Sequence, residues 1–206
     1  MPKIVDPEAR RDEVVQAVFR IARRDGLAHA SLRNVAQEAG LAVGSVRHYF
    51  AGHGEMMVFA LHAMTERISA RLQVHADRLL SGDGAVDRRR ATEDFLAEML
   101  PLDERRREEC TVWLEFATAA RTDPALRPDA EALTVAMRRT VGRLLDGARR
   151  AGSLRPGLGP DAVPLEAERL CALIDGLTLT AVLHPGHLSP ETMRAALRAH
   201  LDGLRA

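Results

Sequence analysis

Apolar residues recur every three to four positions along most of this chain, which is the spacing of an amphipathic helix. In residues 7–25 they form a single stripe, and Gly26 follows directly as a helix-ending residue. Glycine and proline residues separate the later stripes. The same spacing predicts helices over residues 55–80, 87–100, 103–121, 125–151, 165–183 and 189–204. With two short helices in residues 31–50, the pattern predicts an all-α fold of about nine helices and no strand.

Residues 31–50 predict two short helices joined by a tight turn. Ser31 is a favourable N-cap for the first helix, and Gly40 ends it. The second helix starts at Val43 and places Val46 and Phe50 on its inner face. A helix, a glycine-containing turn and a second helix are the parts of a helix-turn-helix motif. The start and outer face of the second helix present residues that can approach or hydrogen-bond a duplex: Val43, Gly44, Ser45, Arg47, His48 and Tyr49.

The composition favours helices and offers no enzyme motif. Only seven of the 206 residues are aromatic, whereas an all-β sandwich normally carries more aromatic and β-branched residues. Lys3 is the only lysine, so the body of the chain has no candidate for a P-loop or Schiff-base lysine. Gly-x-Ser-x-Gly and His-Glu-x-x-His patterns are also absent. A helical enzyme and a purely structural helical protein remain the competing classes.

Metal, disulfide and membrane chemistry find little support in the sequence. Cys110 and Cys171 are too few for a disulfide scaffold, and we expect buried free thiols. His184 and His187 flank a turn without an obvious third ligand, which predicts a surface loop and no metal site. No apolar run approaches the 18 residues of a membrane span, and the N-terminus lacks a signal-peptide pattern. These features predict a cytoplasmic protein that needs no cofactor.

The charge is balanced, with 29 Lys and Arg against 29 Asp and Glu. Even the first 60 residues hold eight basic and seven acidic residues. A generic attraction to polyanions is therefore not expected, and DNA would be held by a few placed groups and helix N-termini. The placed groups are Arg33, Arg47, His48 and His53. We expect a modest dependence of DNA affinity on salt.

The stretch from Ser31 to Phe50, SLRNVAQEAGLAVGSVRHYF, resembles the DNA-binding signature of the TetR family. The specific part is the spacing of AGL, GSV and YF within it. The second half resembles the regulatory domain of the BetI-type branch of that family, more loosely, through LPLD at 100–103, VWL at 112–114, RTDP at 121–124 and DGL at 175–177. The resemblance implies a DNA-binding domain over residues 1–54 and a regulatory, dimerising domain over residues 55–206.

Three residues depart from the family pattern. Ala42 stands where a Ser or Thr usually caps the second helix of the motif, and loss of such a cap typically costs about 1 kcal/mol. Arg47 stands where many members have Tyr. His53 replaces a common Lys that opens the next helix and meets a phosphate.

The resemblance implies a homodimeric transcriptional regulator, most simply a repressor that a small, largely apolar effector releases from a palindromic operator in double-stranded DNA. Ser31, Arg33, Tyr49 and His53 would hold phosphates. Base edges would meet Val43, Gly44, Ser45, Arg47 and His48. The alternatives are packing for Tyr49, pairing with a neighbouring Asn or Glu for Arg33, and a regulator that acts without an effector.

The regulatory domain is expected to supply an effector pocket and a dimer interface. The pocket candidates could equally be plain core. They are Met64, Phe95, Met99, Trp113, Phe116, Met137, Asp175, Leu177 and Thr178. The last two helices predict a four-helix bundle across a two-fold axis, although their stripes could instead serve an internal core. The interface candidates are Leu170, Ile174, Gly176, Ala181, Met193, Leu197, Leu201 and Leu204.

Overall fold

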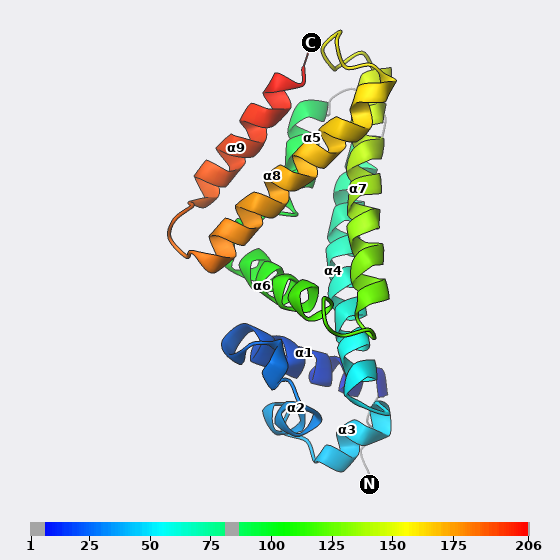
Figure 1. Ribbon diagram of the computed structural model, residues 1–206, viewed down its shortest axis with the longest axis vertical. Coiled ribbons are helices and arrows are strands. Elements are labelled where there is room, and N and C mark those ends of the chain that lie inside the picture. Colours follow the sequence, from blue (N-terminus) through cyan, green and yellow to red (C-terminus); the bar gives the residue numbers. More distant parts are fainter. Residues whose placement is uncertain (1–6, 81–86, 206) are drawn as a thin grey trace. The chain divides into compact units, whose positions relative to one another are not determined.

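The computed structural model describes residues 7–80 and 87–205, which are helical apart from turns, loops and one isolated bridge between Leu154 and Arg205 (Figure 1). The α-helices of these residues are α1 (Pro7–Asp25), α2 (Leu32–Glu38), α3 (Val43–Tyr49), α4 (His53–Leu80), α5 (Arg88–Ala97), α6 (Glu104–Ala119), α7 (Arg127–Arg150), α8 (Val163–Leu183) and α9 (Pro190–Gly203). Two 3₁₀ turns, η1 (Leu27–His29) and η2 (Pro160–Ala162), precede α2 and α8. The predicted all-α fold is confirmed.

Helix ends differ from the prediction by a few residues, each for a local reason. Helix α5 ends at Ala97, because the next three backbone N–H groups bond three residues back, as in Leu100 N–H to the Ala97 carbonyl at 3.1 Å. Pro101 disfavours the helical conformation of the residue before it. Helix α8 begins at Val163, two residues earlier than predicted, because Pro164 is tolerated in a first turn.

The chain forms two compact units that are not consecutive stretches of sequence. One unit combines residues up to Arg67 with Thr111–Glu131. The other combines Ile68–Cys110 with Ala132–Ala206. Helices α4, α6 and α7 therefore contribute residues to both units. The boundary between a DNA-binding domain over residues 1–54 and a regulatory domain over residues 55–206 stays a prediction.

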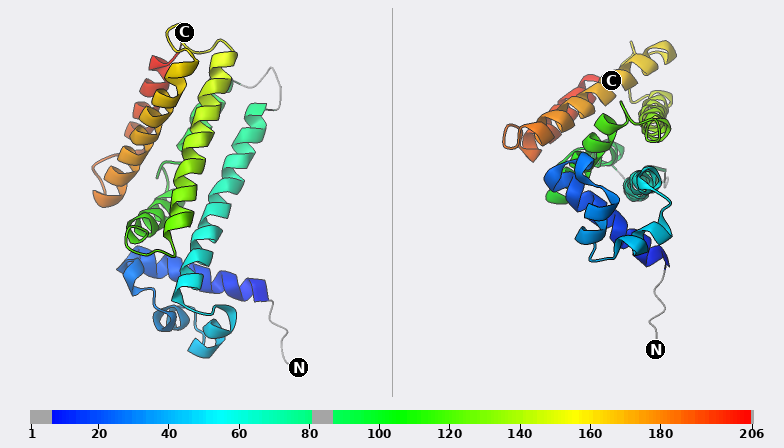
Figure 2. Two further views of the ribbon diagram at one scale, coloured as in Figure 1. Left: turned by 45° about the vertical axis from the view of Figure 1, so that its right-hand side comes forward. Right: turned by 60° about the horizontal axis from the view of Figure 1, so that its bottom comes forward.

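In the first unit, α1 packs against both helices of the predicted motif (Figure 2). Val15 and Val18 of α1 are buried, as are Val35 of α2 and Val46 of α3. Phe19 of α1 is half-buried, and its ring centroid lies 5.4 Å from the guanidinium carbon of Arg67. Helices α2 and α3 are thus held on one α1 scaffold through short apolar side chains.

The second unit has its own core, in which α9 packs against α5 and α8 of the same chain (Figure 2). This arrangement corrects the predicted dimer contacts. Leu201 is half-buried against the same core, and Gly176 is exposed. The other six interface candidates are buried in it and offer no surface to a second chain: Leu170, Ile174, Ala181, Met193, Leu197 and Leu204. The apolar stripe of α9 thus has its partner within the chain, as the internal-core alternative proposed.

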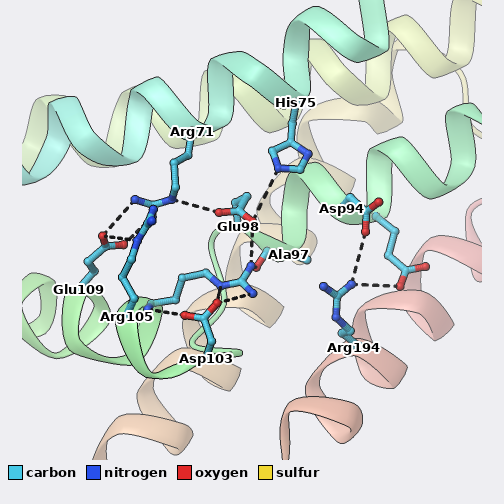
Figure 3. Close-up of polar contacts among 11 residues, drawn as sticks. Arg71, His75, Asp94, Ala97, Glu98, Asp103, Arg105, Glu109 and Arg194 are labelled. Atoms are coloured by element: carbon cyan, nitrogen blue, oxygen red, sulfur yellow. Dashed lines mark hydrogen bonds and ion pairs between the residues drawn. The ribbon is translucent and has the colours of Figure 1, made fainter. Parts of the chain in front are cut away.

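Ion pairs reinforce the contact between α5 and α9. The buried carboxylate of Glu93 accepts two hydrogen bonds from Arg198, at 2.8 and 3.1 Å. Arg89 binds Asp202 at 2.6 Å, and Arg194 lies 3.5 Å from Asp94 (Figure 3). The hydrogen bonds from Arg198 lower the pKa of Glu93 below its usual range.

Glu93→Gln is expected to lower the Tm at pH 7 by about 3 °C, because it removes a paired carboxylate whose partner is half-exposed. The folded-state pKa lies below the unfolded one, so the ionised pair stabilises the fold above the ordinary glutamate pKa of about 4.3. This contribution is lost as the pH falls through the folded-state pKa. Thermal scans from pH 7 to pH 3 should show the difference between wild type and variant shrinking toward zero. A difference that stays constant over this range would contradict the assignment.

Candidate DNA-binding interface

Helix α2 is closed at both ends by local hydrogen bonds. The hydroxyl of Ser31 accepts the backbone N–H of Asn34 at 3.2 Å, so the predicted N-cap is confirmed. At the other end Gly40 has a positive φ of 66°, and its N–H bonds to the Gln37 carbonyl. The N–H of Leu41 bonds to the Ala36 carbonyl at 2.8 Å, which completes a Schellman motif. The turn into α3 is therefore fixed by backbone geometry that a glycine allows.

Helix α3 is anchored by one buried residue and one residue just beyond its end. Val46 and Phe50 are at most 1 % exposed, as the sequence predicted. Val43 and Tyr49 are half-buried, and the Tyr49 ring meets the His48 ring edge-on with centroids 5.2 Å apart. The exposed positions of the helix are Gly44, Ser45, Arg47 and His48. The outer face of α3 thus presents small residues at its start and two nitrogen donors further along.

The arginines of the first unit divide into engaged and available groups. Arg20 and Arg24 both bind Glu38, at 2.7 and 3.1 Å, and these hydrogen bonds lower the pKa of the Glu38 carboxyl. Arg33 and Arg47 are exposed and form no ion pair with any described residue. The alternative in which Arg33 pairs with a neighbour finds no support. The available guanidinium groups of Arg33 and Arg47 lie on α2 and α3, the two helices of the motif.

The connection from α3 to α4 is short and capped. His53 is the first residue of α4 and is exposed. The carboxylate of Glu55 accepts the backbone N–H of Ala51 at 2.6 Å, in the manner of a capping box. The exposed ring of His53 and the N-terminus of α4 therefore lie together at the start of a long helix.

Ala42 stands at the N-cap of α3 in an extended conformation and supplies no side-chain hydrogen bond. Ala42→Ser is expected to raise the free energy of unfolding by about 1 kcal/mol, because a serine oxygen can accept one of the free N–H groups at that end. Urea titration measures the change. Ser31→Ala is the matched control, because it removes an existing cap and should lower stability by a similar amount. A destabilised Ala42→Ser beside a destabilised Ser31→Ala would contradict the account.

Two residues of the first unit, one in contact with the motif and one with the turn before it, were missed by sequence reasoning. Arg11 of α1 donates a hydrogen bond to the Tyr49 carbonyl at 3.2 Å. Glu115 of α6 accepts the backbone N–H of Leu27 at 2.8 Å, next to Gly26, whose φ is 87°. These contacts join residues 38 and 88 positions apart, so no local sequence pattern indicates them.

The predicted effector residues fall into both compact units. Met64 and Phe116 of the first unit are buried, and Trp113 is half-buried. In the second unit, one hydrophobic cluster brings together Phe95, Met99, Met137 and Leu177. Thr178 is buried and donates its hydroxyl to the Met99 carbonyl at 3.5 Å, and burial raises the pKa of Asp175. Of the nine predicted residues, six therefore belong to the second unit, and three of these lie on α8 itself.

A half-buried ionic network lies beside this cluster, at the junction of α5 and α6 (Figure 3). Glu98 precedes Met99 and accepts hydrogen bonds from Arg71 of α4 at 3.1 Å and from Arg106 of α6 at 2.9 Å. Arg71 also binds Glu109 of α6 at 2.5 Å, and His75 lies 3.7 Å from Glu98. Within the second unit the network ties α4 to the start of α6.

The two cysteines and the histidines of the α8–α9 turn were also candidates for special chemistry in the sequence. Both thiols are free, and burial raises the pKa of Cys110 to about 12. His184 and His187 are exposed in the turn between α8 and α9. Among the described residues, no helix has the length and apolar character needed to cross a membrane.

Known proteins are similar to this chain in sequence and in fold. Residues 88–206 match a family described as "BetI-type transcriptional repressor, C-terminal". The HTH-type transcriptional regulator PksA of Bacillus subtilis is 31% identical over 99% of this chain and 94% of its own length. BetI of Vibrio parahaemolyticus is 29% identical over 98% and 95%. The crystal structure of a transcriptional regulator from Rhodococcus sp. Rha1 superposes with a TM-score of 0.77 at 30% identity, covering 94% of this chain and 95% of that one.

Proposed function

Because this chain belongs to the TetR family of transcriptional regulators, with a C-terminal domain of the BetI type, we propose that it represses transcription by binding a palindromic operator through α3. Members of this family bind DNA operators, dimerise and bind small-molecule ligands, and the relatives are regulators and not enzymes. The observation that carries the proposal is the outer face of α3, where Arg47 is exposed and free of any ion pair with a described residue.

Each exposed residue of the motif has a role that its chemistry supports. Gly44 and Ser45 add little bulk, so α3 can approach the floor of a major groove. Arg47 can bind guanine through two hydrogen bonds, the commonest specific contact between proteins and DNA. Val43 and His48 flank it and would meet neighbouring base edges.

The phosphate contacts would come from the ends of the short helices. Ser31 and Arg33 lie at the exposed start of α2, and His53 opens α4. Tyr49 keeps its hydroxyl as a possible donor, although its half-buried ring also serves packing. With so few charged groups, the affinity should depend only modestly on salt. A regulator of this kind acts where the DNA is, so we expect it in the cytoplasm.

For the homodimer we propose an interface on the outer face of α8. Leu165, Leu179 and Leu183 are 66%, 44% and 55% exposed. Ala172 and Gly176 lie between them at helical spacing and are also exposed. A row of large apolar side chains facing solvent is typical of a surface that a second chain covers. In a two-fold dimer the same face of each chain would meet the other.

For the effector we propose a small, largely apolar molecule that binds at the cluster of Phe95, Met99, Met137 and Leu177. Methionine side chains adapt readily to a ligand. Displacement of Met99 would act on Glu98 and so on its hydrogen bonds to Arg71 and Arg106. Helix α4 carries Arg71 and begins at His53, four residues after the end of α3, so strain in the network would act on the helix that directly follows the DNA-binding motif. By linkage, operator DNA must then weaken effector binding by the same factor.

A gel-shift assay tests the regulator proposal. The probes are the promoter fragment directly upstream of the chain's own coding sequence and a shuffled fragment of equal length. The proposal expects a discrete complex on the promoter fragment that excess shuffled DNA does not displace. Equal binding to both fragments, or no complex with an intact dimer, would refute it. Small apolar molecules that raise the Tm of the protein should then dissociate the protein–DNA complex. Their failure to do so would favour the alternative of a regulator without an effector.

A further inference from the structure

Arg11 holds the C-terminal end of α3 although it belongs to neither helix of the DNA-binding motif. Its guanidinium donates to the Tyr49 carbonyl at 3.2 Å. The same group lies 5.6 Å from the ring centroid of Phe50 and 5.3 Å from that of Phe59 in α4. The two rings themselves meet edge-on at 5.4 Å. One side chain of α1 therefore contacts the last carbonyl of α3, the residue that follows α3, and a residue of α4.

Helix α3 depends on such a contact because it has little stability of its own. It contains seven residues, and isolated helices of that length do not persist in water. Its N-terminus has no side-chain cap, since Ala42 occupies that position. The last carbonyls of a helix lack backbone partners, and a positive charge is favourable beside them. Arg11 supplies both the hydrogen-bond donor and the charge.

We propose that Arg11 is a positioning residue for DNA sequence recognition, which fixes α3 against α1 and α4 so that Arg47 and His48 meet the bases in register. This inference rests on the proposed function, because it takes α3 as the helix that enters the major groove. Arg11 is half-buried, with its guanidinium directed to Tyr49 and to the two rings. It acts on DNA through α3 and not through a phosphate.

A positioning role and a phosphate-binding role for Arg11 predict different effects on operator DNA and on random DNA. A phosphate contact contributes to all DNA and adds about one to the slope of log affinity against log salt. A positioning contact affects base readout, which requires the side chains of α3 to be placed accurately. Loss of Arg11 should therefore weaken binding to the operator much more than binding to random DNA and should leave the salt slope unchanged.

Arg10 provides a matched control on the neighbouring position of α1. It has the same charge and pairs with Glu13 one turn along the helix, at 2.5 Å. Among the described residues it forms no hydrogen bond to α3 or α4. Arg10→Met and Arg11→Met remove the same charge from adjacent positions, but only Arg11→Met removes a contact to Tyr49 and the rings, whereas Arg10→Met removes an ion pair within α1.

The experiment measures Kd for a duplex that the wild-type protein selects from a random pool, and for a shuffled duplex, over a series of salt concentrations. Arg11→Met should weaken operator binding about tenfold, which corresponds to about 1.4 kcal/mol, and should change shuffled-DNA binding less than about twofold. Arg11→Lys keeps the charge and one donor but loses the planar stacking, and should recover part of the affinity. Arg10→Met should bind the operator like the wild type.

Three results would overturn the proposal: a salt slope lowered by about two in the Arg11→Met dimer, about one for each protomer, equal losses on both duplexes, or equal losses in Arg10→Met and Arg11→Met. Amide hydrogen exchange of the DNA-free protein tests the role of Arg11 independently of the DNA-binding measurements. Amides of residues 46–50 should exchange faster in Arg11→Met than in Arg10→Met, and equal exchange would refute the role of Arg11. Because this measurement needs no DNA, it separates failure of the inference from failure of the proposed function.

Discussion

Arg47→Ala is expected to lower operator affinity by at least about 30-fold, because each of two half-sites loses a base contact worth about 1–3 kcal/mol. Arg47 is exposed on the outer face of α3 and forms no ion pair with a described residue, so the substitution leaves no buried group unsatisfied. The fold should keep its stability. Affinity for shuffled DNA, which depends on phosphate contacts, should fall less than about threefold.

Selection from random duplexes shows whether the sequence preference changes. Arg47→Ala should lose its preference at one base pair in each half-site while the flanking positions are kept. Tyr49→Phe is the control, because removal of one hydroxyl from a phosphate contact should weaken all duplexes alike. Equal loss on operator and shuffled DNA for both variants would contradict the assignment of Arg47 to base recognition.

Leu179→Glu is expected to convert the dimer to a monomer and to lower operator affinity by about 10²- to 10⁴-fold. Leu179 is 44% exposed at the centre of the outer face of α8, where a charge costs nothing in the monomer but is desolvated in the dimer. A dimer binds the operator more tightly than a monomer by about this factor, because its second protomer binds the second half-site intramolecularly once the first is bound. Sedimentation measures the oligomeric state, and a gel shift on the selected operator measures the affinity.

Val74→Glu is the matched control for the dimer face. Val74 is 69% exposed on α4, so the same charge enters an exposed apolar position on a different helix. It should leave the dimer and the operator affinity intact. Leu197→Ala should instead lower the free energy of unfolding by about 2–5 kcal/mol, because Leu197 is fully buried within one chain. A dimeric Leu179→Glu, or dissociation by both glutamate variants, would rule out the α8 interface.

Local chemistry made most of the helical pattern predictable from the sequence. Ser31 caps α2 as expected, and Ser189 caps α9 in the same way, because an N-cap depends on a side chain and a backbone N–H three residues away. Gly26 and Gly40 end their helices with positive φ, which glycine adopts without strain. The exposed face of α3 follows from the burial of Val46 and Phe50, four residues apart.

Long-range packing was not predictable in the same way. The stripe of α9 indicated which side of the helix is buried but not what buries it, and the partners are α5 and α8 of the same chain. For this reason most of the predicted dimer contacts fell on residues of α8 and α9 that are buried within the chain, whereas Gly176 lies on the exposed face of α8 that we propose as the interface. Arg11 and Glu115 act through contacts to backbone atoms far along the chain, which leave no pattern in the sequence.

Selection of DNA by the wild-type dimer from a pool of random duplexes tests the central claim most directly. A dimer with one α3 in each of two successive major grooves should enrich an inverted repeat with half-sites centred about 10–10.5 bp apart or at a multiple of that spacing. Footprinting on the enriched duplex should show the same two-fold symmetry. A folded dimer that enriches no motif, or a single motif without symmetry, would contradict recognition of a palindrome through α3.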